Sequence, residues 1–259
     1  MKRAAEAHSW RVVAASVRGA SHERTGQPCQ DAHCWAARPG GVLVAAVADG
    51  AGSAALAEVG AETAARTAVE ILAACAGIAP PESEAAWQMR LLAALQAARE
   101  AVLAEAEARE APVRELATTL ILAVATPDRV AAAQVGDGAA VVRDREGNLH
   151  ALTAPECGEY INETTFLIAP GAAEAANVTV WQGAVTHLAL LSDGLQRLAL
   201  RMPDGEPHAP FFAPLFRFVE GMTDVTEAEA QLAAFLRSPR VSGRTDDDLT
   251  LLLASLLRE

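Results

Sequence analysis

The sequence predicts an α+β fold in which helices cover antiparallel β-strands, and three observations support this prediction. Val42–Val47 is a continuous apolar run, which is typical of a strand buried on both faces. Two long stretches with apolar residues at helical spacing then follow one another, between residues 53 and 109. Next come short strand patterns separated by turn residues, from residue 116 to residue 152. Because strands follow strands instead of alternating with helices, we expect antiparallel pairing.

The first half of the chain should contribute two strands and two helices. Trp10–Ser16 and Val42–Val47 are the expected strands. Ser53 is placed to cap the first helix, because a serine oxygen accepts backbone N–H groups at a helix start. This helix should end at Gly77 and the double proline that follows, and the second should run from Glu82 to about Arg109. The two consecutive helices would cover one face of a sheet.

Short strands should dominate the middle of the chain. Four patterns with turns between them predict an antiparallel meander: Leu116–Val124, Val130–Val135, Ala139–Arg143 and Asn148–Leu152.

The last third of the chain mixes strands and helices. Val178–Trp181 and His187–Leu191 should form a further hairpin, and Gln196–Met202 should open a helix. Residues 203–214 are rich in Pro, Gly and charge, and their stretch His208–Phe212 is either a partner surface or a buried flap. Residues 226–236 return to helical spacing, and residues 249–256 form the final strand.

The composition limits the classes of partner. A chain of 259 residues suits one large domain, and we expect a single domain over residues 1–259. The formal charge of −12 argues against a nucleic-acid partner or an anionic membrane surface, since phosphates would be repelled. It suits a cation-binding protein, although solubility alone explains it equally well. The charged N-terminus lacks the apolar core of a signal peptide, and no apolar run reaches the length of a membrane span. We therefore expect a cytoplasmic protein.

Acidic residues stand at the ends of several expected strands. Asp49, Asp137 and Asp193 each follow an apolar run, and Asp246-Asp247-Asp248 opens the last strand. One Asp-Gly pair is most simply a turn. Several carboxylates at one sheet edge, however, form an all-oxygen site that suits a hard cation such as Mg²⁺ or Mn²⁺. The set as a whole predicts an acidic metal site.

Three other kinds of site fit the sequence less well. The Gly-rich stretch after Asp49 lies where a dinucleotide fingerprint would stand, but the expected second strand and its acidic residue do not follow. Cys29, His33 and Cys34 hint at zinc, but no second ligand pair has the required spacing. Ser192 lies beside Asp193 without an identifiable histidine partner, which argues against a Ser-His-Asp site. The cysteines form no CxxC pair, so we expect reduced thiols.

The order of the motifs resembles that of the metal-dependent protein phosphatases of the 2C type, and in particular their bacterial branch. The segments that carry the resemblance span nearly the whole chain: Gln30-Asp31, Val47-Ala48-Asp49-Gly50, Ala117-Thr118-Thr119-Leu120, Val135-Gly136-Asp137-Gly138, Leu191-Ser192-Asp193-Gly194-Leu195 and Asp247-Asp248-Leu249-Thr250. Two further segments resemble a divergent 2C-like bacterial subgroup: Ser21-His22 to Gln30-Asp31, and Glu159-Tyr160 to Phe166. The resemblance implies a four-layer α-β-β-α sandwich of two antiparallel sheets flanked by helices.

The resemblance also implies the roles of the acidic residues. Asp49 would bridge two Mn²⁺ or Mg²⁺ ions, Asp193 and Asp247 would complete the first, and the Gly50 carbonyl would help to hold the second. Asp31 would act through metal-bound water. Asp137, together with Asp193, would form a weaker third site. Two close cations lower the pKa of a bridging water and hold the phosphoryl oxygens, so no nucleophilic side chain is needed.

Three residues depart from the family pattern. Gln30 replaces the acidic residue usual before Asp31, Gly26 stands where many relatives carry a phosphate-binding arginine, and Gly138 replaces a serine. A cation must still face the phosphate dianion, because an all-acidic site would repel it. His22, Arg24 and Arg18 are the nearest candidates in the sequence, although each is also explained as a surface charge. The polar residues Asn162, Glu163 and Thr164 are further candidates to line the site.

Two hypotheses of function follow from the resemblance. The first is a serine/threonine phosphoprotein phosphatase that acts on phosphorylated proteins and opposes a bacterial Ser/Thr kinase. The second is a pseudophosphatase that serves as a binding or scaffold module, suggested by Gln30 and the missing arginine. The retained acidic residues argue against the second hypothesis, because a scaffold has no need to keep like charges together.

Overall fold

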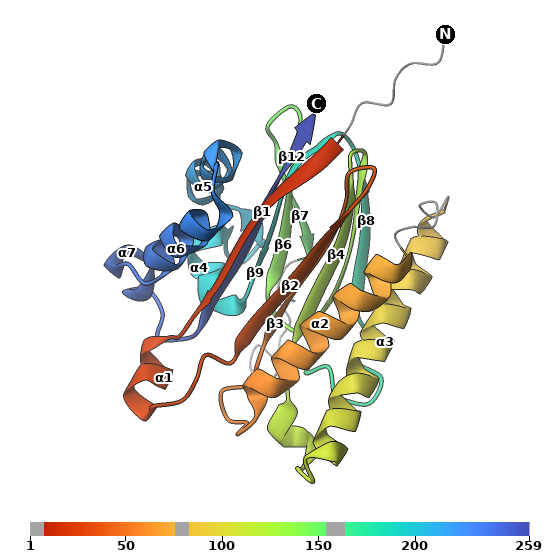
Figure 1. Ribbon diagram of the computed structural model, residues 1–259, viewed down its shortest axis with the longest axis vertical. Coiled ribbons are helices and arrows are strands. Elements are labelled where there is room, and N and C mark those ends of the chain that lie inside the picture. The colour runs from red at the N-terminus through yellow and green to blue at the C-terminus, as the bar shows by residue number, and fades with distance from the viewer. Residues whose placement is uncertain (1–7, 76–82, 154–163, 259) are drawn as a thin grey trace.

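Two five-stranded antiparallel sheets pack face to face in the computed structural model, which describes residues 8–75, 83–153 and 164–258 (Figure 1). In spatial order, the first sheet consists of β1 (His8–Val17), β12 (Leu249–Arg258), β9 (Val185–Leu191), β6 (Ala139–Asp144) and β7 (Leu149–Thr153). The second consists of β2 (Asp31–Arg38), β3 (Val42–Asp49), β4 (Leu120–Thr126), β5 (Arg129–Val135) and β8 (Asn177–Gln182).

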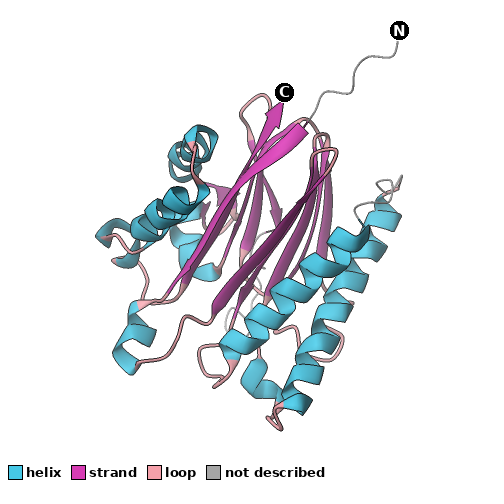
Figure 2. Ribbon diagram, in the orientation of Figure 1, coloured by secondary structure: helices cyan, strands magenta, loops and turns pink. Residues whose placement is uncertain are grey.

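Helices cover the outer faces of both sheets (Figure 2). The long helices α2 (Ala57–Cys75) and α3 (Glu84–Ala108) pack on the second sheet, while α5 (Ala209–Gly221) and α6 (Val225–Leu236) pack on the first. The short elements are α1 (Ala20–Thr25), α4 (Gln196–Ala199), α7 (Pro239–Ser242), the 3-10 turns η1 (Val113–Leu116) and η2 (Asp193–Leu195), and the small hairpin of β10 (Leu200–Arg201) and β11 (Glu206–Pro207). The layers are therefore α-β-β-α, which confirms the expected fold class.

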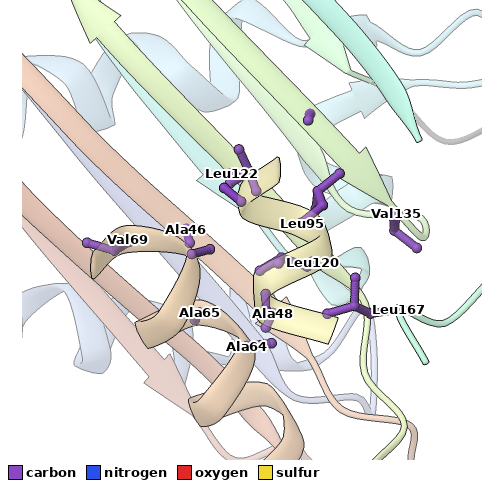
Figure 3. Close-up of a cluster of buried hydrophobic side chains, with 14 of the residues drawn as sticks. Ala46, Ala48, Ala64, Ala65, Val69, Leu95, Leu120, Leu122, Val135 and Leu167 are labelled. Carbon is purple, nitrogen blue, oxygen red and sulfur yellow. The ribbon is translucent and has the colours of Figure 1, made fainter. Parts of the chain in front are cut away.

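The alternation of side chains along β3 shows how the layers adhere. Leu43, Ala45 and Val47 point into the core between the sheets, whereas Val44, Ala46 and Ala48 point toward α2 and α3. All six are at most 1% exposed, so the continuous apolar run is buried on both faces, as expected. In Figure 3, Ala46 and Ala48 face Ala64, Ala65 and Val69 of α2. These small residues let the helix lie close to the sheet.

The two long helices match their expected positions except at their starts. The first begins at Ala57, four residues after Ser53, so Ser53 does not cap it. The second is capped by Ser83, whose Oγ accepts a hydrogen bond of 3.2 Å from the N–H of Ala86. Gly77, Pro80, Pro81 and Glu82 lie outside the described residues. Among the described residues, no helix is both long and apolar enough to span a bilayer.

The expected meander is instead two hairpins that belong to different sheets. The first, β4 with β5, lies in the second sheet, and the other, β6 with β7, lies in the first. The chain crosses from one sheet to the other between Val135 and Ala139, where Gly136 has φ +104°. A side chain at Gly136 would be strained and would also meet Thr119, with its Cβ 2.5 Å from that of Thr119. Strand spacing alone could not reveal this crossing.

The expected hairpin of Val178–Trp181 and His187–Leu191 is also wrong. Strand β8 pairs with β5, while β9 lies between β12 and β6 in the other sheet. Burial explains the separation, because β8 is half-buried and suits a sheet edge, whereas β9 is almost wholly buried and needs neighbours on both sides.

Two further differences occur between residues 196 and 221. The helix expected over Gln196–Met202 ends at Ala199. The Pro-rich stretch, in contrast, contains helix α5, because Pro210 lies in its first turn, where the N–H has no partner within the helix. The apolar residues Phe212, Leu215, Phe216 and Val219 are spaced for one helical face and pack on the first sheet. Phe212 is fully buried, so of the two alternatives for His208–Phe212 the structure favours a buried flap and not a partner surface.

Candidate active site

Four acidic residues meet where strand ends of the two sheets come together, near α1 at the lower end of Figure 1. Asp31 and Asp49 are directly paired at the end of the β2–β3 ladder. Asp193 lies two residues after β9 and Asp247 two residues before β12, and these strands are antiparallel neighbours. The carboxyl groups of Asp49 and Asp193 share a hydrogen bond. The expected convergence of Asp49, Asp193 and Asp247 at one rim thus has a topological basis, and Asp31 joins them.

Burial and mutual repulsion raise the pKa values of all four carboxyl groups. Loss of solvent is the largest cause in each case, and neighbouring carboxylates add to it. The pKa of Asp31 rises to about 7 and that of Asp193 to about 6. The pKa of Asp49 rises well above its ordinary value, and that of Asp247 also rises. Holding these groups together therefore costs electrostatic free energy, which is typical of a functional site.

Hydroxyl and amide groups hold the buried carboxylates in place. Oδ2 of Asp31 accepts a hydrogen bond of 2.7 Å from Ser192 Oγ, which itself accepts one of 3.0 Å from the N–H of Thr250. The backbone of Asp49 is held by Thr118 and Thr119, through hydrogen bonds to its C=O and from its N–H. Ser192 thus serves to position Asp31, and its described partners include no histidine.

The donor set has atoms to spare for a cation. Oδ1 of Asp31 and Oδ1 of Asp193 are buried without a described hydrogen-bond partner. Gly50 packs so closely against the backbone of Gln30 that a Cβ at Gly50 would lie 2.6 Å from the carbonyl oxygen of Gln30. A larger residue would therefore displace the backbone directly after Asp49. All-oxygen donors of this kind fit Mg²⁺ or Mn²⁺. Within residues 8–75, 83–153 and 164–258, no three acidic, histidine or cysteine side chains form a ready-made metal site.

Packing or backbone conformation explains two of the three departures from the family pattern, and the third, Gln30, has a hydrogen-bond partner outside the acidic cluster. A Cβ at Gly138 would lie 2.5 Å from Cδ1 of Ile121 and 2.6 Å from the carbonyl oxygen of Leu191, so packing excludes a serine there. Gly26 ends α1 with φ +73°, a conformation that disfavours arginine. Gln30 is buried, and its Nε2 donates a hydrogen bond of 3.1 Å to the carbonyl oxygen of Ala54. It supports the loop after Asp49 rather than the acidic cluster.

Asp137 lies near enough to Asp193 for its charge to help raise the pKa of the Asp193 carboxyl group, and it has two contacts of its own. Its Oδ2 accepts a hydrogen bond of 2.8 Å from Thr164 Oγ1, and its carbonyl oxygen accepts one from Gln196 Nε2. Thr164 thus contacts a candidate metal-site residue. Asn162 and Glu163, which were expected to line the site with it, lie outside the described residues.

The three cationic candidates differ in their surroundings. Arg18 is exposed and donates to the carbonyl oxygen of Gln27 at 3.1 Å. Arg24 forms an exposed ion pair with Asp246 at 3.2 Å. His22, in contrast, is only 6% exposed, and its Nδ1 lies 3.0 Å from Oδ2 of Asp248. Only His22 of the three is held inside the site by a buried partner.

Asp248, for which the sequence predicts no separate role, lies at a junction between elements. Its Oδ1 accepts a hydrogen bond of 2.6 Å from the N–H of Gly19, and its Oδ2 accepts one of 2.5 Å from the N–H of Gln30. Asp248 therefore ties together the starts of α1, β2 and β12. The sequence did contain a signal for this role, because Asp248 directly precedes the apolar run of the last strand. A carboxylate that is buried there requires hydrogen-bond partners.

The zinc alternative finds no support in the geometry of the described residues. Nδ1 of His33 lies 2.9 Å from Ser16 Oγ, and Cys29 and Cys34 are free thiols. Burial and the nearby carboxylates of Asp31 and Asp248 raise the pKa of the Cys29 thiol, so it stays protonated.

Comparisons with known proteins agree with this architecture. The family model described as protein phosphatase 2C matches residues 18–237. Serine/threonine-protein phosphatase 3 from Escherichia coli (strain K12) is 37% identical over 257 residues, covering 95% of this chain and 98% of that protein. The serine/threonine phosphatase Stp1 from Staphylococcus aureus superposes with a TM-score of 0.62 at 14% identity, covering 94% of each chain. The catalytic domain of the serine threonine protein phosphatase PstP, in complex with two manganese ions, has a TM-score of 0.59 at 19% identity, covering 96% of this chain and 99% of that one. The chain described here therefore belongs to the protein phosphatase 2C family.

Proposed function

We propose that this chain is a metal-dependent serine/threonine phosphoprotein phosphatase. The observation that carries the proposal is the gathering of Asp31, Asp49, Asp193 and Asp247 at one rim, with raised pKa values and two unpartnered buried oxygens. Such a cluster is costly without a cation. The Escherichia coli relative, at 37% identity, is named a serine/threonine-protein phosphatase, which supports the substrate class.

The residues of the cluster receive roles in this proposal. Asp49, Asp193 and Asp247 would be the side-chain ligands of two divalent ions, with the carbonyl oxygen of Gly50 as a further ligand. When bound, the ions would supply a water of lowered pKa and positive charge opposite the phosphoryl oxygens. Asp31, held by Ser192, would orient that water through its free Oδ1. The PstP structure with two manganese ions favours Mn²⁺ among the candidates, with Mg²⁺ as the alternative.

A third ion at Asp137 is a weaker part of the proposal. Thr164 already occupies one oxygen of Asp137 with a hydrogen bond of 2.8 Å. A third ion would therefore use Oδ1 of Asp137 together with Asp193.

His22 is the phosphate-binding cation that we propose. It is buried beside Asp248, whereas Arg24 and Arg18 are exposed and bonded elsewhere. Arg24 and Arg18 would then act only as surface charges at the rim of the site.

The biological setting that we propose is a bacterial cytoplasm, where this phosphatase would oppose a Ser/Thr kinase. The described cysteines Cys29, Cys34 and Cys75 are free, as a reducing compartment requires. We also propose that residues 1–259 are one domain, because one core lies between the sheets and receives residues from strands of both.

Hydrolysis of a phosphothreonine peptide tests the proposal. With Mn²⁺ or Mg²⁺ present, the purified protein should release phosphate, and Asp49→Asn and Asp193→Asn should each abolish this. The exposed Asp204 provides a control, since Asp204→Asn removes the same charge outside the cluster. No hydrolysis with either metal at any pH from 5 to 9 would refute the proposal.

A binding or scaffold module remains the second candidate, and the neutral Gln30 at the rim favours it. Calorimetry separates the two functions, because a scaffold would take up no Mn²⁺ at millimolar concentration. The retained acidic cluster favours the enzyme.

A further inference from the structure

Three exposed arginines stand close in the chain to two residues of the acidic cluster. Arg197, in α4, comes four residues after Asp193, and Arg244 comes three residues before Asp247. Arg240 lies in α7, four residues before Arg244. Figure 1 shows α4 and α7 on the left of the molecule, on the side of the first sheet and away from α2 and α3. The arginines therefore belong to the border that the first sheet gives to the site.

The fold brings together the two segments that carry these arginines. Gly194 packs so closely on the residues before β12 that a Cβ at Gly194 would collide with the carbonyl oxygen of Asp248. Arg197 follows Gly194 by three residues, which span only about 5 Å in a helical turn. Arg244 precedes Asp248 by four residues. Both arginines thus extend from one point of contact beside the acidic cluster.

The charges of these arginines are not neutralised by the rest of the described chain. Within residues 8–75, 83–153 and 164–258, no carboxylate forms an ion pair with Arg197, Arg240 or Arg244. The arginines at α1 differ, because Arg24 is paired with Asp246 and Arg18 donates to a backbone oxygen. Unpaired charges at the mouth of a site act on any charged group that approaches it.

The border that the second sheet gives to the site is neutral. The loop that follows Asp49, residues 50–56, contains no charged residue. Glu115 supports this loop by accepting a hydrogen bond of 3.0 Å from the N–H of Ala55, and it is itself paired with Arg114 at 3.2 Å. The two sheets therefore present different borders to a substrate, with unpaired arginines on the first and an uncharged loop on the second.

We propose that Arg197, Arg240 and Arg244 form a docking surface for acidic residues of the phosphoprotein substrate. This inference rests on the proposed phosphatase function and adds a substrate class to it, namely phosphoserine or phosphothreonine near glutamate or aspartate. Guanidinium groups match carboxylates in both charge and shape. A short acidic segment is favoured over a nucleic acid, because a chain with a net charge of −12 repels a long polyanion.

The length of the chain limits where the acidic residues of the substrate can lie. The Cα atom of Arg244 is at most about 11 Å from that of Asp247, because three residues of extended chain span no more. Arg240 lies about one helical turn further, which adds roughly 6 Å. An extended peptide covers these distances in about three to five residues. Acidic residues three to five positions from the phosphorylated residue should therefore reach the docking surface.

The first test compares two peptides with a central phosphothreonine, which carry either Glu or Gln at the third to fifth positions on both sides. With Mn²⁺ present, kcat/KM for the Glu peptide should exceed that for the Gln peptide by about tenfold at 50 mM NaCl. The ratio should fall below about threefold at 0.5 M NaCl, because salt screens exposed charges. A ratio of one or less at low salt would overturn the proposal.

Charge reversal locates the preference on the surface. Arg244→Glu should remove the preference for the Glu peptide, because it replaces attraction by repulsion. Arg145→Glu is the matched control, since Arg145 is an exposed arginine in the turn between β6 and β7. This control makes the same change in net charge and should keep the preference. An equal loss of preference in both variants would show a general effect of charge and would overturn the docking surface.

A binding measurement separates this inference from the phosphatase function. Fluorescence anisotropy with non-hydrolysable phosphonate versions of the two peptides reports affinity without turnover. Kd for the Glu version should be about tenfold lower than for the Gln version, and Arg240→Glu should reduce this difference. Preferred binding by a protein that hydrolyses neither phosphopeptide would refute the phosphatase function and keep the docking surface. Hydrolysis of both at equal rates would do the reverse. Equal displacement of the Glu version by a single-stranded oligonucleotide of the same charge would also overturn the proposal.

Discussion

Asp31 on β2 and Asp49 on β3 are direct cross-strand partners, so two acidic side chains stand side by side at the end of one ladder. Like charges that face each other across a sheet are destabilising. In this position both are also buried. The charge of Asp31 raises the pKa of Asp49, and the charge of Asp193 raises the pKa of both. The fold thus concentrates negative charge at the place where the proposed reaction requires a bound cation.

The metal-free protein should become less stable as the pH rises from 4 to 8. Asp31 and Asp193 have folded pKa values of about 7 and about 6, above the ordinary value of 3.8. The folded state therefore binds more protons than the unfolded state in this range, and its stability falls as the groups ionise. Thermal unfolding without metal should give a lower midpoint at pH 8 than at pH 5. A higher midpoint at pH 8 would mean that these carboxyl groups are not strained.

Mn²⁺ should reverse this dependence on pH. The ligands bind as carboxylates, so metal binding releases protons and becomes stronger as the pH rises. The increase in unfolding midpoint on addition of 1 mM Mn²⁺ should be larger at pH 8 than at pH 5. A Mn²⁺-free buffer with added Na⁺ at equal ionic strength controls for the screening of charges by salt. An increase that is equal at both pH values would argue against binding at the cluster.

Asp31→Asn should separate stability from activity. The substitution removes one buried charge and keeps an acceptor for Ser192 Oγ. We expect the metal-free protein at pH 8 to gain roughly 1 kcal/mol or more in free energy of unfolding, because a repulsion is relieved, while phosphatase activity falls by at least about 100-fold. Asp204→Asn should change neither quantity. Destabilisation by Asp31→Asn in the absence of metal would show that the charge is compensated.

Gly138→Ser should destabilise the protein although it restores the residue usual in relatives. The new Cβ would lie 2.5 Å from Cδ1 of Ile121 and 2.6 Å from the carbonyl oxygen of Leu191. We expect a loss of about 1–3 kcal/mol in urea unfolding, as for other overpacked core positions. Gly221→Ser is a suitable control, because a Cβ at Gly221 meets nothing within 4 Å. Equal effects of the two substitutions would contradict the packing argument.

Much of the fold followed from local patterns, and the errors have a common origin. Sequence patterns predicted the apolar run of β3, the apolar stripes of α2 and α3, and the last strand. Burial requires apolar residues at the spacing of each element, and this spacing is visible in the sequence. The assignment of strands to sheets was not visible, since β5 and β6 are separated by three residues but belong to different sheets. The mostly half-buried β2 and the proline-containing α5 were missed, because tertiary packing decided both.

The candidate site divides in a similar way. Asp49, Asp193 and Asp247 could be proposed from sequence, because strand ends at one edge bring their side chains together. The partnership of Asp248 with His22 joins residues 226 positions apart and depends on the three-dimensional path of α1. The reason for Gly138, which lies between β5 and β6, is the side chain of Ile121 on β4. Contacts of this kind leave no periodic trace in the sequence.

The most direct test is a crystal structure of the protein soaked in Mn²⁺, with anomalous data collected at the manganese absorption edge. Two anomalous peaks should lie among the carboxylates of Asp49, Asp193 and Asp247, with one within coordination distance of the carbonyl oxygen of Gly50. Crystals that hydrolyse 4-nitrophenyl phosphate in the presence of Mn²⁺ but show no peak among these three carboxylates would contradict the dinuclear site.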